Sequence, residues 1–165
     1  MEWNDDLEKI TQQERELILP RLDAQAAWDL GSRLRTMAVQ RNLGVVIDVR
    51  RFGQPLFYAA MDGTTPDNVE WVRRKSNVVA RFHRSSYAIG LKEKIKNETL
   101  LEGQGLPIAD YATHGGSFPL AVASAGVVGS ATVSGLAQRS DHELVIEALC
   151  AVLGRDYEKL KLASE

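Results

Sequence analysis

The sequence is short of three features: cysteine, long apolar runs and an excess of charge of either sign. Its 165 residues include one cysteine, Cys150, which cannot form a disulfide within the chain, and no Cys-x-x-Cys pair for zinc or thiol redox chemistry. No apolar run approaches the roughly 20 residues that cross a bilayer, and the acidic start, with Glu2 and Asp5, differs from a signal peptide. A net charge of −2 argues against a strongly basic nucleic-acid binder. We therefore expect a cytoplasmic protein without a membrane or nucleic-acid partner.

Standard catalytic and nucleotide-binding motifs are also missing. There is no Gly-x-Gly-x-x-Gly opening a helix, no Walker-type Gly-Lys-Ser/Thr, no His-Glu-x-x-His and no Gly-x-Ser-x-Gly nucleophile elbow. The sequence therefore predicts no metal site, and it leaves open whether the protein is an enzyme.

The chain is long enough, and at 44% apolar residues hydrophobic enough, to bury one core. We find no repeat and no break in composition that would mark a second domain. We expect a single domain over residues 1–165, with an N-terminal helical extension over about residues 1–20 that Pro20 ends.

Apolar periodicity and turn residues predict nine further segments. Asp23 is a predicted N-cap, Thr65-Pro66 a second helix start, and Ser140 to Glu143 a capping box. The predicted helices cover residues 23–42, 66–84, 87–95 and 140–153, the strands cover 45–49, 56–61, 117–123 and 127–134, and 97–107 is an irregular connector. The order is α-α-β-β-α-α-β-β-α. Paired strands of this kind predict an α+β fold, an antiparallel sheet flanked by helices on its faces.

The helix over 66–84 carries two residues that need partners. Lys75 and His83 fall within its mostly apolar arc, where an unpaired charge or imidazole is costly. Lys75 can snorkel to the sheet edge or pair with Asp62, or it can be the cation of a pocket. His83 lies near the helix end, where it can bind the last carbonyls. The arginines on the other side form either a solvated face or a basic patch.

Two other histidines are candidate ligands. His142 shares the apolar stripe of the last helix, and the positive end of the helix dipole favours its neutral form, which can ligate a metal or haem iron. The alternative is a buried core histidine. His114 precedes Gly115 and Gly116, and these glycines allow a ligand or another backbone segment to come close. His114 is the strongest functional candidate of the three histidines.

Several blocks of the sequence, in the same order, resemble one family. They are Gly53-Gln54-Pro55 running to Met61-Asp62-Gly63, the helix with Lys75, Gly115-Gly116-Ser117-Phe118-Pro119-Leu120, and Val128 to Gly135 followed by Asp141. Together, over roughly residues 23–153, the sequence resembles the HbpS/GlcG-like or haem-degrading domain family, and within it the uncharacterised branch. The resemblance implies a profilin-like antiparallel sheet, a ring-like or higher homo-oligomer, and haem or corrinoid-related ligands.

The resemblance transfers Met61, Asp62, Gly63 and Lys75 as a turn-and-helix motif, and Gly115 and Gly116 as a strand entry. Our leading hypothesis is a homo-oligomer that binds haem or another small anionic ligand near these residues and His114. For haem, His114 or His142 would be the axial ligand, and Lys75 or Arg74 would meet a propionate. The absence of Cys-x-x-Cys-His makes the attachment non-covalent.

Two alternatives come from other classes of protein. One is an enzyme that uses Lys75 as a base or Schiff-base amine, with Asp62 as its partner. The other is a non-catalytic adaptor or scaffold oligomer, in which apolar stretches and the face formed by Arg73, Arg74 and Arg81 contact other proteins.

Overall fold

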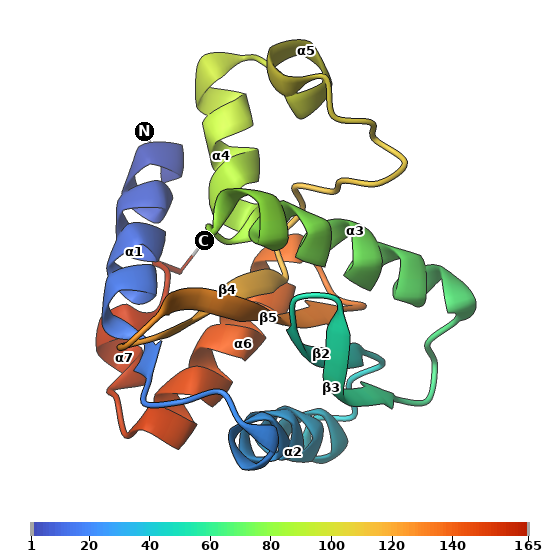
Figure 1. Cartoon of the computed structure of the whole chain (residues 1–165), viewed down its shortest axis with the longest axis vertical. Helices are drawn as coiled ribbons and strands as arrows, with labels where there is room; N and C mark the ends of the chain where they lie inside the picture. The colour runs from blue at the N-terminus through green and yellow to red at the C-terminus, as the bar shows by residue number, and fades with distance from the viewer. Residues whose placement is uncertain (1, 165) are drawn as a thin grey trace.

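A mixed five-stranded sheet forms the middle of the fold in the computed structural model, which describes residues 2–164 (Figure 1). The strands are β1 (Ile18–Leu19), β2 (Val46–Arg51), β3 (Gln54–Ala60), β4 (Ser117–Val122) and β5 (Gly126–Ser134), in the spatial order β1-β4-β5-β2-β3. Both predicted hairpins are confirmed, because β2 pairs antiparallel with β3 and β4 with β5. The expectation of a wholly antiparallel sheet is wrong in one respect: the two-residue β1 pairs parallel with β4.

Helices cover both faces of this sheet, which confirms the predicted α+β class. They are α1 (Glu2–Glu16), α2 (Ala24–Gln40), α3 (Pro66–Phe82), α4 (Ser86–Lys96), α5 (Leu100–Gln104), α6 (Gln138–Leu153) and α7 (Tyr157–Leu160). α3 lies across one face, and α2 and α6 lie on the other (Figure 1). α4 and α5 project beyond the sheet, so the connector between α5 and β4 returns along α3.

Local signals placed two helix starts correctly and one incorrectly. The Asp23 carboxylate accepts the N–H of Ala26 at 2.8 Å, as an N-cap should, and α3 begins at Pro66 after Thr65. The capping box at Ser140 is wrong: α6 begins two residues earlier, at Gln138. The reason is that the Asp141 side chain accepts the N–H of Leu136 at 2.9 Å and so holds the turn before the helix.

The other differences between the predicted and the observed elements involve short elements of two to five residues. α1 ends at Glu16, before Pro20, because the chain then enters β1. α5 lies inside the connector expected to be irregular, capped by Thr99, whose hydroxyl accepts the N–H of Glu102. α7 follows the last predicted helix. Elements of two to five residues contain too little periodicity to be read from the sequence.

The two faces of the sheet differ in polarity because side chains alternate along each strand. The face toward α2 and α6 carries the apolar core, with members from both hairpins and both helices, among them Leu30, Leu34, Ile47, Phe118, Val133, Ile146 and Leu149. Along β5 the intervening residues are Ser130, Thr132 and Ser134, all buried. The Thr132 hydroxyl donates to the Ser117 hydroxyl at 2.9 Å. The face toward α3 is therefore lined with small polar groups.

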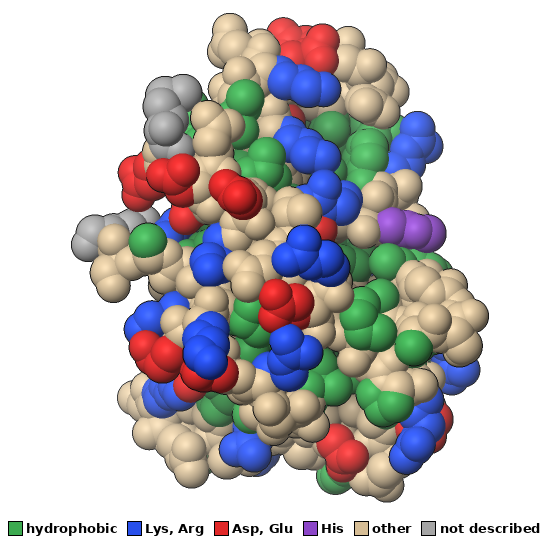
Figure 2. Space-filling view, turned by 90° about the vertical axis from the view of Figure 1, so that its left-hand side faces the viewer, with side chains coloured by type: hydrophobic (Ala, Val, Ile, Leu, Met, Phe, Trp, Pro, Cys, Tyr) green, Lys and Arg blue, Asp and Glu red, His purple; other side chains and the backbone are tan. Residues whose placement is uncertain are grey.

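α1 lies along one side of the molecule, next to α4 and α7 (Figure 1). Ile10 of α1 is fully buried in a small cluster with Tyr87, Leu91 and Leu162. Seen from the α1 side, acidic and basic side chains are interspersed over the surface, with small apolar areas between them (Figure 2).

Candidate functional site

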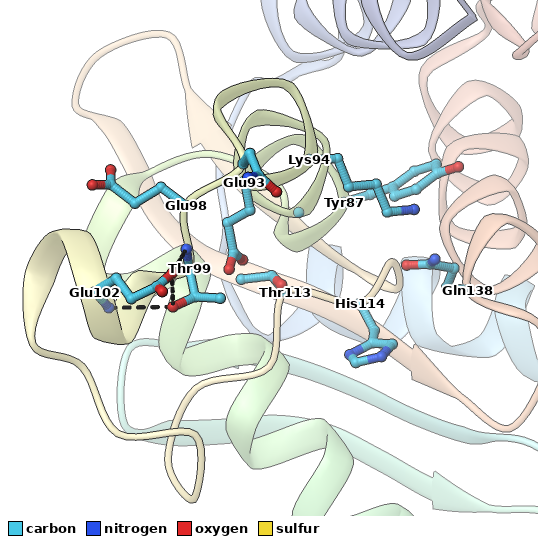
Figure 3. Close-up of a pocket in the computed structure, with 11 residues that line it drawn as sticks. Tyr87, Glu93, Lys94, Glu98, Thr99, Glu102, Thr113, His114 and Gln138 are labelled. Atoms are coloured by element: carbon cyan, nitrogen blue, oxygen red, sulfur yellow. Dashed lines mark hydrogen bonds between the residues drawn. The ribbon is translucent and has the colours of Figure 1, made fainter.

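His114 lies between two hollows at the end of the sheet where β4 begins. The larger hollow, here called the α4 groove, has a volume of about 550 Å³ and runs along α4 (Figure 3). Its lining comprises Tyr87, Gly90, Glu93, Lys94, Asn97, Glu98, Thr99, Glu102, Thr113, His114 and Gln138. The smaller hollow, here called the Lys75 pocket, has a volume of about 250 Å³. Its lining comprises Asn68, Trp71, Lys75, His114, Ser134, Gly135, Leu136, Gln138 and Asp141. His114 and Gln138 belong to both.

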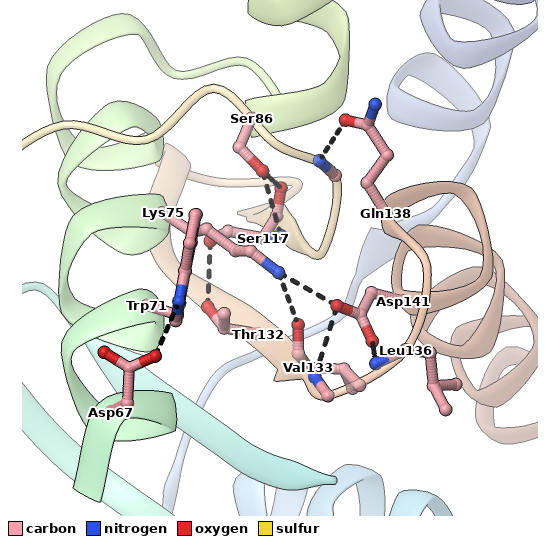
Figure 4. A network of polar contacts seen from close by, with 12 residues as sticks. Asp67, Trp71, Lys75, Ser86, Ser117, Thr132, Val133, Leu136, Gln138 and Asp141 are labelled. Carbon is pink, nitrogen blue, oxygen red and sulfur yellow. Dashed lines mark hydrogen bonds and ion pairs between the residues drawn. The ribbon is translucent and has the colours of Figure 1, made fainter. Parts of the chain in front are cut away.

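Lys75 is at the base of the smaller hollow, carried there by the buried face of α3. Its side chain is 3% exposed. The ammonium donates to the Asp141 carboxylate at 2.9 Å and to the Val133 carbonyl at 3.2 Å (Figure 4). The sequence correctly indicated that Lys75 needs a partner, but the predicted partner, Asp62, is wrong. The acid is Asp141, which belongs to α6, the helix that follows β5 along the chain.

Asp62 and Gly63 form the exposed turn after β3 and line neither hollow. Gly63 has φ +93°, a left-handed conformation that favours glycine. A Cβ on Gly44 would lie 3.2 Å from the Asp62 carbonyl oxygen, so this turn packs closely on the chain before β2. The Met-Asp-Gly motif therefore shapes the backbone here, and the enzyme alternative loses the acid that was assigned to Lys75.

Asp141 is held by several donors besides Lys75. Its carboxylate accepts the backbone N–H of Leu136 at 2.9 Å and that of Gly135 at 3.4 Å. Burial raises the pKa of Asp141, while Lys75 and these hydrogen bonds oppose the rise. Burial lowers the pKa of Lys75, and Asp141 opposes that change. Burial thus disfavours both charges, and each is retained only through the other.

The two glycines before β4 allow this close approach. A Cβ on Gly116, which has φ +138°, would lie 2.7 Å from the Lys75 ammonium nitrogen and 2.3 Å from the Val133 carbonyl oxygen. A Cβ on Gly115 would lie 2.3 Å from the backbone oxygen of Gln138. The Gly115 N–H also donates to the Gln138 side chain at 3.1 Å. Any larger residue at either position would push the β4 entry away from the buried lysine.

His114 is exposed, and its ring contacts the edge of Trp71, with the ring centroids 5.0 Å apart. Partial burial lowers the pKa of His114, and the nearby positive charges of Lys75, Arg74 and Lys94 lower it further. The imidazole is therefore neutral at pH 7, in the form that can act as a ligand. Glu93 opposes this effect on the pKa, so charges of both signs surround His114.

His142 does not reach either hollow. The side chain is 0% exposed, and its Nε2 lies 2.8 Å from the amide oxygen of Gln13 in α1. Burial lowers its pKa to about 3. The alternative that the sequence left open for His142, a buried core histidine, is the one the structure shows. An axial-ligand role for His142 would require the core between α1 and α6 to open.

Two arginines of α3, Arg73 and Arg74, hold the connector that precedes β4. Arg74 donates to the Ile108 carbonyl at 3.0 and 2.7 Å and lies over the Trp71 ring. Arg73 binds the Asp110 carboxylate at 3.0 Å and the Ala109 carbonyl at 2.9 Å. These bonds fix the connector before β4 onto α3, and they use two of the three guanidinium nitrogens of Arg74. His83, predicted within the apolar arc, is exposed and stacks on Phe52.

No group of three or more His, Cys, Asp and Glu side chains within residues 2–164 could hold a metal ion. No helix in the described part of the chain is long and apolar enough to span a membrane.

The fold is shared by several solved proteins of the HbpS and DUF336 type. One described as HbpS has a TM-score of 0.64 at 23% identity, covering 82% of this chain and 92% of that one. A structure described as the PduOC:heme complex has a TM-score of 0.67 at 16% identity, covering 79% and 94%. The Ybr137w protein has a TM-score of 0.83 at 28% identity, covering 91% and 89%.

The chain belongs to the HbpS-like family. The family model described as "Haem degrading protein HbpS-like" matches residues 22–150. A UPF0303 protein of Burkholderia thailandensis is 63% identical over 158 residues, which is 96% of each chain. A UPF0303 protein of Acidobacterium capsulatum is 59% identical over 162 residues, 98% of each chain. The family resemblance noted in the sequence is thereby confirmed.

Proposed function

We propose that the protein is a cytoplasmic, homo-oligomeric binding protein whose ligand contacts His114, and that haem is the first ligand to test. The single observation that carries the proposal is the position of His114. Of the three histidines, it alone combines an exposed, neutral imidazole with a place on the wall of both hollows. A haem complex of a protein with the same fold supports the choice of ligand.

The residues around His114 fit haem in part. The imidazole would be the axial ligand, and Lys94, which lines the α4 groove, would meet a propionate. Trp71 offers an apolar surface beside the imidazole. Bound haem would supply an iron centre whose reactivity the axial ligand tunes. Glu93, Glu98 and Glu102, on the same groove, would direct the propionates toward Lys94 by repulsion.

Titration with hemin tests the proposal directly. We expect wild-type protein to shift the Soret band, and His114→Ala to lose that shift. His83→Ala is the matched control, because His83 is exposed and lies outside both hollows. An unchanged Soret band with the wild type, or equal binding by both variants, would rule out haem ligation by His114. Native mass spectrometry of protein taken from its own cells would give the subunit number and any retained ligand.

A further inference from the structure

The Lys75 pocket has unused hydrogen-bond donors at its base. The Lys75 ammonium has three N–H groups, and two of them bind Asp141 and Val133. Ser134 also lines the pocket and is 3% exposed, yet its hydroxyl bonds to none of the described residues. The side-chain NH2 of Asn68, on the same lining, likewise has no acceptor within residues 2–164, although its oxygen accepts the N–H of Thr65.

The side-chain carboxylate and amide oxygens that line the pocket, in contrast, already accept hydrogen bonds. One Asp141 oxygen accepts from Leu136, and the other accepts from Lys75 and Gly135. The Gln138 amide oxygen accepts the N–H of Gly115. The Ser134 hydroxyl and the third Lys75 N–H both line the pocket, so one acceptor supplied by a ligand could receive hydrogen bonds from both. Donors in excess of acceptors select an anion or a strong neutral acceptor.

Charge and size narrow the ligand further. The Lys75 and Asp141 charges offset each other. Asp141 would therefore repel a ligand with two negative charges more strongly than a ligand with one. The volume of about 250 Å³ equals roughly eight water molecules at their share of the liquid volume. Trp71 and Leu136 provide apolar walls. These features favour a single carboxylate on a short apolar body over a phosphate or a large anion.

We infer that the Lys75 pocket binds a small monocarboxylate, whose oxygens accept from the Lys75 ammonium and the Ser134 hydroxyl. The inference rests on the proposed ligand-binding role, and it uses donor atoms other than the His114 imidazole. It names the chemical class of a ligand for the Lys75 pocket, whereas haem would bind at His114 in the α4 groove. The two ligands can therefore be tested separately.

The test is an NMR titration of the full chain with butyrate, followed at the Gly135 and Leu136 amides and the Trp71 indole N–H. We expect saturable shifts at these groups, and binding of inorganic phosphate and butyramide at least about tenfold weaker, because each lacks either the single charge or the planar carboxylate. No saturable shift with millimolar butyrate, or phosphate binding as tight as butyrate, would overturn the inference.

Ser134→Ala is the decisive variant, because the hydroxyl has no partner among the described residues that its removal could leave unsatisfied. Loss of one hydrogen bond to the ligand should weaken butyrate binding by about three- to tenfold. Ser130→Ala is the matched control: Ser130 is equally buried on the same face of β5 but outside the pocket. Equal binding by Ser134→Ala and wild type would contradict the proposed contact.

Lys75→Met should abolish butyrate binding, but it leaves Asp141 without its cation and can unfold the protein. Ser134→Ala keeps the inference testable in that case. His114→Ala separates the two proposals. Loss of the Soret shift with retained butyrate binding supports both, whereas butyrate binding without any Soret shift in the wild type overturns the haem proposal alone. Loss of butyrate binding in His114→Ala would overturn the assignment to Lys75 and Ser134.

Discussion

At the scale of single residues, His142 is the most strongly perturbed histidine. Its ring packs against Tyr87 and Phe118, with centroids 5.4 and 5.9 Å away. Nε2 lies against the amide oxygen of Gln13, which makes Nε2 the protonated nitrogen, and Nδ1 has no partner among the described residues. Burial, with a smaller contribution from Arg139, lowers the pKa to about 3. A proton on Nδ1 would place an uncompensated charge in the core.

This burial predicts a pH dependence of stability. The folded pKa is about 3 and the unfolded value is near 6.5. Between these values the unfolded chain binds the extra proton, so the free energy of unfolding falls as the pH falls below about 6.5. From pH 7.5 to pH 5.5, His142 alone should lower the free energy of unfolding by about 1.4 kcal/mol, measured by urea denaturation.

His142→Gln isolates this contribution, because a glutamine cannot titrate. The variant should be less stable overall, yet its free energy of unfolding should fall less between pH 7.5 and 5.5 than that of the wild type. The carboxylates contribute equally to both proteins. The same pH slope in variant and wild type would show that His142 takes up a proton without loss of the fold.

At the scale of elements, α3 holds the connector that precedes β4. Arg73, Arg74 and Asn77 donate to backbone or side-chain oxygens of residues 108–110. The Ala112 N–H also donates to the Arg74 carbonyl at 3.2 Å. The connector bears Ile108, which is 66% exposed. The arginines therefore order a loop with little apolar anchoring, and this loop leads into His114.

Hydrogen exchange should reveal this role. Replacing both Arg73 and Arg74 with alanine removes the side-chain bonds to Ile108, Ala109 and Asp110, so amide exchange over residues 106–113 should become at least about tenfold faster. β5 should keep its protection. Arg81→Ala is the control, because Arg81 is exposed on the same helix and forms no hydrogen bond or ion pair with the described residues of the connector. Unchanged exchange in the double variant would mean that the loop is ordered by other contacts.

The sequence predicted long elements and their caps, and it failed where a boundary depends on a distant partner. Thr65-Pro66 determines the start of α3 through neighbouring atoms alone. The start of α6 depends on Asp141, whose carboxylate is engaged by Lys75 from another helix as well as by Leu136. β1 exists only because β4 supplies its hydrogen-bond partners. A strand of two residues has no periodicity from which the sequence could predict it.

At the scale of the whole molecule, the helices nearest the two chain ends, α1 and α7, pack on each other and on the same side of the fold. α1 has three ion pairs to basic residues far away in the sequence: Asp6 with Arg139, Glu14 with Arg84, and Glu16 with Arg155. The Gln13 side chain donates to the Leu160 carbonyl at 2.8 Å. α1 and α7 lie outside the region that the family model matches. These contacts seal His142 and bury Ile10.

Ile10→Ala tests how much this closure stabilises the fold. Ile10 is fully buried against Tyr87, Leu91 and Leu162, so truncation should lower the free energy of unfolding by about 3 kcal/mol. Ile95→Ala, on the exposed side of α4, should change it by less than about 0.5 kcal/mol. Equal stability of the two variants, measured by urea denaturation at one pH, would show that α1 folds independently of the rest.

The sequence by itself determined the α+β class, the two hairpins, most helices and the need of Lys75 for a partner, because these follow from periodicity, turn residues and the cost of a buried charge. Only the tertiary structure decided which acid meets Lys75, and which histidine and which hydroxyl line the Lys75 pocket. Asp141, His114 and Ser134 lie far from Lys75 in the sequence. Their proximity comes from the crossing of α3 over β5 and from the glycines that let β4 approach, and no local pattern contains that information.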